Sequence, residues 1–134
     1  MSPTSKLYVA IYNAEGIYKH WNIFIDGPTA KEKIILQAMG SSTRYRFDES
    51  NYNARESPDL LLLVYLCHVQ NSSFGAIRDA AREVVIHNEF PGYNCQDYVL
   101  ELLDLLEKKG LVDGADEGYK CSKQMVVDEQ EGLV

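Results

Sequence analysis

Residues 92–98 have the sequence GYNCQDY, which is typical of a turn that enters a helix. The Pro-Gly pair before this turn interrupts regular structure, and Asn94 is a residue type that caps helix N-termini well. Asp97 stands three positions after Asn94 and completes a capping-box pattern. The sequence therefore predicts that a helix begins directly after Asn94, with Cys95 in its first turn.

This helix should end at the Lys-Lys-Gly triplet of residues 108–110, because basic residues followed by glycine are typical of a helix C-terminus. Helical spacing places an apolar stripe on the same side as Cys95: Val99, Leu102, Leu103 and Leu106. A buried cysteine commonly serves only as a small apolar side chain. In a first helical turn, however, free N–H groups and the helix dipole favour a thiolate. Cys95 is therefore a candidate nucleophile.

Composition indicates one globular domain over residues 1–134, with its core in about 7–112 and an acidic, partly irregular tail over 113–134. The formal net charge of −7 argues against nucleic acid and anionic membranes as partners. The apolar run at residues 60–67 is too short to span a membrane. Since no signal-peptide pattern is present, we expect a cytoplasmic location.

The sequence indicates no resident metal or cofactor. Its three cysteines are widely spaced, which argues against both a disulfide framework and a zinc site. Asp26, His20 and Asp48 could be considered as metal ligands, but no ligand spacing marks them. Neither a phosphate-binding glycine loop nor a dinucleotide motif is present. The sequence does not indicate the oligomeric state.

Hydrophobic patterning predicts an α+β fold: an antiparallel or mixed sheet of about five strands, with two main helices on one side. Gly-containing turns separate several of the apolar segments. The apolar run that begins at Leu60 reads as a strand buried on both faces. The remaining polar stretches are predicted loops, at 48–58 and 110–118. The predicted strands are 7–12, 18–25, 34–39 (alternatively a short helix), 43–47 and 60–69, and the second helix is 74–87.

His20 is the preferred partner for Cys95 among the three histidines. His68 adjoins Cys67 in a strand, where neighbouring side chains point to opposite faces, and His87 suits a helix C-terminus. His20 lies at the start of a strand, where it can face a helix that docks on the sheet. A thiol attacks a carbonyl as thiolate, and a neighbouring imidazole can take up its proton.

These elements resemble the permuted papain-like proteins, which include the lecithin–retinol acyltransferase-like enzymes and the PPPDE peptidases. The resemblance rests on HWNIFIDG (20–27) in a strand and NCQDYV (94–99) at a later helix start. YKHW (18–21), TRY (43–45) and the Asn-Cys pair also resemble small uncharacterised fungal proteins with a YHW…NC pattern. The resemblance implies a permuted papain-like arrangement with Cys95 as nucleophile and His20 as base.

One departure concerns the residue that orients the imidazole. The fungal pattern continues TRY with a histidine, whereas this chain has Arg46, which offers no acceptor for an imidazole N–H. The substitutes considered are Gln37 first, then Asn22 or Thr43. Tyr8 or Tyr12 could supply a hydrogen-bond donor. The candidate substrate-binding residues are Trp21, Asn22, Tyr8, Arg46 and Asn94.

Three functions are compatible with this pattern. The first is a cysteine-dependent hydrolase or acyltransferase that acts on an ester, thioester or amide carbonyl of a small-molecule or acyl substrate, as an accessory enzyme of fungal metabolism. The second is a peptidase that processes ubiquitin-like or SUMO-like proteins. The third is a catalytically inactive ligand-binding module on the same scaffold.

Overall fold

The computed structural model describes residues 3–13 and 18–130. The described residues form five strands followed by three α-helices. The sequence also predicts a turn at residues 13–16, and most of it lies outside the described residues, as does the chain after residue 130. The elements are β1 (Thr4–Tyr12), β2 (His20–Asp26), β3 (Lys33–Met39), β4 (Arg46–Asn51), β5 (Leu60–Gln70), α1 (Phe74–Glu83), α2 (Cys95–Lys108) and α3 (Glu117–Asp128).

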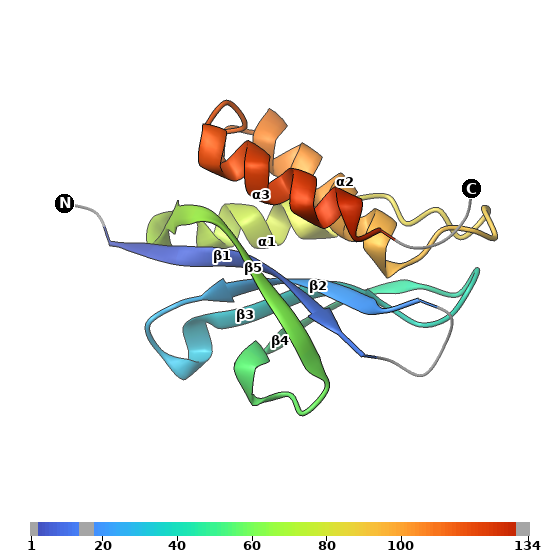
Figure 1. Cartoon of the computed structure of the whole chain (residues 1–134). Coiled ribbons are helices and arrows are strands. Elements are labelled where there is room, and N and C mark those ends of the chain that lie inside the picture. The colour runs from blue at the N-terminus through green and yellow to red at the C-terminus, as the bar shows by residue number, and fades with distance from the viewer. Residues whose placement is uncertain (1–2, 14–17, 131–134) are drawn as a thin grey trace.

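The strands form one antiparallel sheet in the order β4-β3-β2-β1-β5. All three helices lie on the same side of this sheet (Figure 1). The structure thus confirms an α+β fold with an antiparallel sheet and helices on one side. The sequence analysis did not predict α3, which lies in the segment expected to be an acidic tail.

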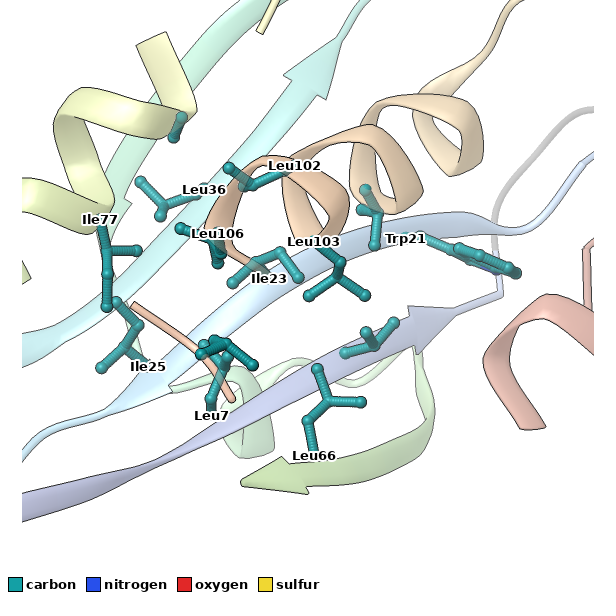
Figure 2. Packing of buried hydrophobic residues seen from close by; sticks show 14 of the residues in the cluster. Leu7, Trp21, Ile23, Ile25, Leu36, Leu66, Ile77, Leu102, Leu103 and Leu106 are labelled. Carbon is teal, nitrogen blue, oxygen red and sulfur yellow. The ribbon is translucent and has the colours of Figure 1, made fainter. Parts of the chain in front are cut away.

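Alternation along β2 separates two hydrophobic layers. Ile23 and Ile25 face the helices and pack with Leu103 and Leu106 of α2 (Figure 2). This main core also includes residues of β1, β3 and α1, and its members are almost completely buried. The apolar stripe predicted for α2 is buried as expected: Val99, Leu102, Leu103 and Leu106.

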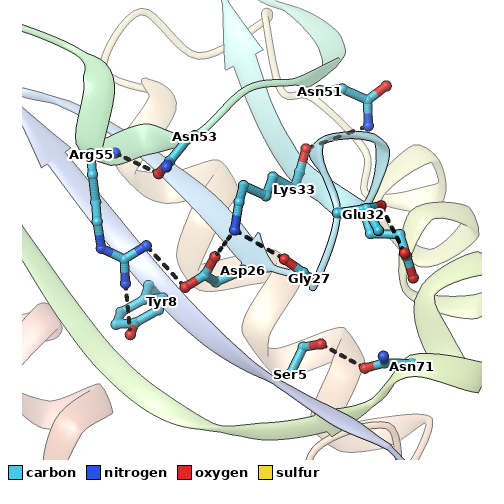
Figure 3. A network of polar contacts seen from close by, with 11 residues as sticks. Ser5, Tyr8, Asp26, Gly27, Glu32, Lys33, Asn51, Asn53, Arg55 and Asn71 are labelled. Atoms are coloured by element: carbon cyan, nitrogen blue, oxygen red, sulfur yellow. Dashed lines mark hydrogen bonds and ion pairs between the residues drawn. The ribbon is translucent and has the colours of Figure 1, made fainter.

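A smaller apolar layer lies on the other face of the sheet. Tyr8 and Phe24 stack there, and a short 3₁₀ turn at Ala54–Glu56 covers them. Arg55 of this turn lies over both rings and binds Asp26 through Nη1 at 2.9 Å (Figure 3). Lys33 Nζ contacts the other Asp26 oxygen at 2.6 Å. Two cations therefore balance one carboxylate and hold the turn on the sheet.

The prediction that residues 60–69 form a strand buried on both faces is wrong. β5 is an edge strand, and Leu61 and Tyr65 are 55% and 41% exposed. An apolar run fits a central parallel strand equally well, so composition did not distinguish the two positions. Two register shifts against β1 also break the alternation that would have marked a half-exposed strand.

The fourth strand begins later than predicted. Gly40 and Thr43 have φ values of 136° and 66°, so a turn occupies the segment expected to start a strand. β4 instead covers Arg46–Asn51, most of which was predicted to be loop because it is polar. The helix predicted for 74–87 ends at Glu83. Residues 34–39 form a strand, as first predicted, and Gly110 ends α2 at a φ of 74°.

Candidate active site

The predicted start of α2 is confirmed in detail. Asn94 Oδ1 accepts the main-chain N–H of Gln96 at 2.8 Å, and Asp97 Oδ2 accepts the N–H of Asn94 at 3.0 Å. These reciprocal bonds form a capping box and fix the first turn of the helix. Cys95 is therefore the first helical residue, held rigidly at the positive end of the helix dipole.

The Cys95 side chain lies against the first residues of β2. Its Sγ–H donates to the main-chain carbonyl of Lys19 at 3.7 Å, and the main-chain N–H of Trp21 faces the sulfur. The buried Gln96 side chain donates to the same Lys19 carbonyl at 2.9 Å. The pairing between β2 and β3 starts only at Ile23, so the chain before Ile23 has no β3 neighbour. The start of α2 supplies hydrogen-bond partners there instead.

Burial raises the pKa of the Cys95 thiol, and only 5% of the residue is exposed. The N–H groups of Trp21 and of the first helical turn oppose this effect, because they stabilise the thiolate. The Asp97 carboxylate adds to the increase. The resting sulfur is therefore a neutral thiol that needs a base before it can act as a nucleophile.

His20 is held by the amide of Gln37. The His20 Nε2 and Gln37 Oε1 atoms lie 2.7 Å apart. Asn22 Nδ2 donates to the same Gln37 oxygen at 3.1 Å, and Gln37 Nε2 donates to Asp48 Oδ2 at 3.0 Å. Both additional bonds require the amide oxygen to face His20, so His20 donates through Nε2–H. The neutral ring then has its acceptor at Nδ1.

Burial lowers the pKa of His20, and the bond to Gln37 opposes this decrease. The imidazole is therefore neutral near pH 7 and is ready to accept a proton. Among the described residues, its Nδ1 atom makes no hydrogen bond. The ring also lies 5.8 Å from that of Tyr12, whose hydroxyl donates to Asn22 Oδ1 at 3.2 Å. Gln37, predicted as the orienter, thus contacts the ring, and its role in catalysis stays a prediction.

The structure brings Cys95 and His20 to the same short segment of chain without a hydrogen bond between their side chains, as judged over residues 3–13 and 18–130. The sulfur contacts the main chain on both sides of His20, at Lys19 and Trp21. The ring belongs to the face of the sheet that carries Asn22 and Phe24, opposite the body of α2. Nδ1 is the ring nitrogen nearer to the histidine's own main chain, and therefore the one closer to this segment.

The other predicted site residues divide into two groups. Asn22 and Asn94 belong to the site, through the Gln37 network and the helix cap. Trp21 is fully buried in the main core, at one end of it (Figure 2). Tyr8 belongs instead to the Arg55 network, where its hydroxyl accepts a bond from Nη2 at 3.1 Å (Figure 3).

Two candidate residues from the TRY…R segment do not join the network. Arg46 pairs with Met39 at the start of β4, and its side chain is exposed. Thr43 lies in the preceding turn, outside the strands. The β4 residue that reaches the site is Asp48, two positions after Arg46 and on the same face of the strand.

Three contributors to the site were not predicted. Asp48 was considered only as a metal ligand, and its place opposite Gln37 is set by the register between β3 and β4. Gln96 follows Cys95 and is fully buried, but no pattern marks a polar side chain for burial. Tyr45 is the third: burial and the Cys95 sulfur raise the pKa of its phenol, and the main-chain N–H of Cys95, which faces the phenol oxygen, opposes this increase.

A family of unknown function, DUF6540, matches residues 7–113 of the chain. The chain belongs to DUF6540. The part that matches DUF6540 includes His20, Gln37, Asp48 and Cys95, and it ends before α3. No curated protein and no solved structure matches the chain.

Two further features concern metals and membranes. Within residues 3–13 and 18–130, no group of three or more His, Cys, Asp or Glu side chains is arranged to hold a metal ion. In the same residues, no helix combines the length and the apolar character needed to cross a membrane.

Proposed function

We propose that this DUF6540 protein is a cysteine-dependent hydrolase or acyltransferase on a permuted papain-like arrangement. Cys95 is the nucleophile, His20 the base and Gln37 the residue that orients His20. The observation that supports this most directly is the 2.7 Å bond between His20 Nε2 and Gln37 Oε1. It leaves Nδ1, the ring nitrogen next to the His20 main chain, as the acceptor, and the sulfur contacts the main chain of the two neighbouring residues, Lys19 and Trp21.

The proposed reaction begins with proton transfer from the Cys95 thiol to His20 Nδ1. The thiolate attacks the carbonyl carbon of the substrate and forms a carbon–sulfur bond, and the carbonyl oxygen takes the negative charge. The intermediate collapses, and the leaving group departs with the proton from His20. Water, or the hydroxyl or amine of an acceptor, then attacks the thioester carbon with His20 again as base. The carbon–sulfur bond breaks, and the Cys95 sulfur leaves and takes back the proton from His20. Attack by water gives hydrolysis, and attack by a hydroxyl or amine gives acyl transfer.

The start of α2 can stabilise the negative charge that develops on the substrate oxygen. Main-chain N–H groups at a helix N-terminus are suitable donors for such an oxygen. The Tyr45 hydroxyl lies beside the Cys95 N–H and can donate a second bond there. Because the pKa of Tyr45 is raised, the phenol keeps its proton at neutral pH.

The proposed pair needs a direct contact between sulfur and ring. Catalytic hydrogen bonds are often long in an unliganded site and tighten when substrate binds. His20 is the first residue of β2, and its strand does not pair with β3 until Ile23. A strand end that is not paired with the neighbouring strand can adjust more readily than a strand centre.

The same geometry favours a second candidate function, a ligand-binding module without catalysis. Its support is that the described side chains of Cys95 and His20 are not hydrogen bonded to each other, and that burial raises the pKa of the thiol. In this case Cys95 serves to fix the start of α2 on Lys19. The two functions differ in whether Cys95 forms a covalent acyl intermediate.

An acyl-trapping experiment tests the proposed function. Incubation with p-nitrophenyl acetate should release a burst of p-nitrophenolate and leave one acetyl group on Cys95, located by peptide mass spectrometry. The Cys95→Ala variant should lose the burst, and Cys67→Ala and Cys121→Ala are matched controls that should keep it. Circular dichroism should show that all variants are folded.

Acetylation of Cys121 alone, or an unchanged burst in folded Cys95→Ala, would reject the enzyme. Cys121 is exposed and therefore reports the reactivity of an unassisted thiol in the same molecule. Thioester and amide analogues that share the acetyl group then define which leaving groups the site accepts.

A further inference from the structure

β5 forms one edge of the sheet, and this edge lacks the usual protection. Natural edge strands are commonly guarded by charged residues or prolines. β5 has the sequence LLLLVYLCHVQ, which contains no Lys, Arg, Asp, Glu or Pro. Leu61, Leu62 and Tyr65 are exposed by 55%, 43% and 41%. The opposite edge, β4, has three charged residues among its six, Arg46, Asp48 and Glu49.

A cavity of about 420 Å³ lies between this edge and the beginning of α3. Four consecutive β5 residues line it, from Tyr65 to His68. Because neighbouring side chains of a strand point to opposite faces, a cavity that touches four in a row follows the edge of the strand. An occupant can therefore reach the main chain of β5 as well as its side chains.

The opposite wall of the cavity is acidic. Asp113 Oδ1 accepts the N–H of Ala115, and Asp116 Oδ2 accepts the N–H of Tyr119, so local bonds fix both carboxylates. Within the described residues, the second oxygen of each has no hydrogen bond or ion pair. A positively charged group that enters this cavity would meet two carboxylates held in place.

The cavity does not have the chemistry of a second catalytic site. Burial and the nearby Asp116 raise the pKa of Cys67 to about 11, so its sulfur is a neutral thiol at physiological pH. His68 Nδ1 bonds to the Tyr65 hydroxyl at 2.6 Å. The cavity therefore has the features of a binding surface and not of a catalytic site.

We propose that the free edge of β5 binds an extended, positively charged peptide segment of another protein, which adds a strand beside β5 and places a Lys or Arg side chain in the cavity against Asp113 and Asp116. Main-chain bonds to an edge strand supply affinity in this mode, and pockets for alternate side chains supply selectivity. The exposed Leu61, Leu62 and Tyr65 provide apolar contacts for the remaining side chains.

Charge favours such a peptide over a second copy of the chain. The chain has a formal net charge of −7, so two copies repel each other. A basic peptide instead brings the charge opposite to that of the Asp113 and Asp116 carboxylates.

The test measures fluorescence anisotropy with two labelled, acetylated peptides, one of alternating valine and lysine and one of alternating valine and glutamate. The lysine peptide should bind and the glutamate peptide should not. The double variant Asp113→Asn, Asp116→Asn keeps the local acceptor oxygens and should weaken binding by about threefold to tenfold. Asp79→Asn with Asp128→Asn removes the same charge elsewhere and should leave binding unchanged.

A second pair of variants tests the edge itself. Leu62→Lys places a like charge on the strand and should weaken binding of the lysine peptide, whereas Val85→Lys, at another exposed apolar position, should not. Bound peptide should also slow hydrogen exchange of main-chain amides in residues 65–68.

Three outcomes would overturn the proposal. The first is that neither peptide binds, and the second is equal binding of the two peptides. The third is a dimer in sedimentation velocity that Leu62→Lys dissociates, which would make a second copy the occupant of this edge. None of these outcomes depends on the acylation of Cys95, so the two proposals stand or fall separately.

Discussion

Two regions of this molecule place a cysteine close to a histidine, and they differ in almost every other respect. Cys95 and His20 come from distant parts of the chain and meet where α2 begins beside β2. Cys67 and His68 are adjacent in β5. His68 bonds to Tyr65, whereas His20 is held by the amide of Gln37.

The difference teaches that the surroundings decide what a thiol can do. Burial raises the pKa of both thiols. At Cys95, the N–H groups of Trp21 and of the helix start oppose this effect, whereas at Cys67 the Asp116 carboxylate adds to it. The proposed enzyme therefore uses the thiol whose partner is remote in sequence.

The largest expected effect comes from replacing the histidine of each region. His20→Gln should slow the acylation of Cys95 by about 10²–10⁴-fold, the usual contribution of a general base. The matched variant His68→Gln should leave the rate unchanged, because His68 lies at the other region. The measurement is the rate of the p-nitrophenolate burst. Equal rates in the two variants would remove His20 from the mechanism.

Alkylation over a range of pH tests the raised pKa of the Cys67 thiol. With a pKa of about 11 against an ordinary value of 9.0, Cys67 should contain about a hundredfold less thiolate at neutral pH than an ordinary thiol. Its iodoacetamide rate, read by peptide mass spectrometry, should therefore rise with pH until about 11. A plateau of the Cys67 rate near pH 9 would contradict this assignment.

Two variants test whether Gln37 orients His20. Gln37→Leu should lower the acylation rate by about tenfold or more, because the ring loses the acceptor that fixes its tautomer. Gln37→Glu, made together with Asp48→Asn so that two carboxylates do not face each other, keeps an acceptor for the ring and should restore much of the rate.

The pH profile distinguishes positioning from a merely structural role of Gln37. The wild-type rate should fall only as the pH drops below 6.5, because burial lowers the pKa of His20 from that value and the neutral ring is the base. In Gln37→Glu with Asp48→Asn the fall should begin at higher pH, since a carboxylate stabilises the imidazolium. Identical profiles in the two proteins would contradict a role for residue 37 in tuning His20.

The smallest expected effect concerns the helix caps of the two regions. Asn94→Ala should lower the free energy of unfolding by about 1–2 kcal/mol, because Asn94 is buried and forms a reciprocal box. Asp116→Ala at the start of α3 should cost about 0.5–1 kcal/mol, since that cap is exposed. Urea denaturation measures both, with Asn94→Asp as the control that keeps a cap. A larger loss at Asp116 would reverse this ranking.

The parts of the fold that could be predicted are those set by local chemistry. Asn94 and Asp97 marked the start of α2, and the glycine after Lys109 marked its end. Strand order is not local, so the apolar sequence of β5 suggested a buried centre although the strand lies at an edge. α3 escaped prediction because its apolar positions are few, with Tyr119 and Val126 buried among polar residues.

Some residues of the candidate site could be named from the sequence, but their contacts could not. Cys95, His20 and Gln37 were named from spacing and chemistry, and the structure joins His20 to Gln37. Asp48 depends on the register between β3 and β4, and Gln96 on which strand end meets the first turn of α2, and both arrangements exist only in the folded chain. Arg46 and Tyr8 lie outside the Gln37 network, and a role for them in substrate binding stays a prediction.

The beginning of β2 pairs with β1 but not with β3, and this has a consequence for how the protein is made. The carbonyl of Lys19, the residue before β2, accepts a hydrogen bond from the side chain of Gln96, 77 positions later in the chain. During synthesis this end of the strand stays open to water until the first turn of α2 has left the ribosome. Contacts of such high sequence separation form late, because closing a long loop costs entropy before any contact rewards it. The proposed chemistry at Cys95 therefore requires the folded chain, because only folding brings the first turn of α2 beside the segment that carries His20.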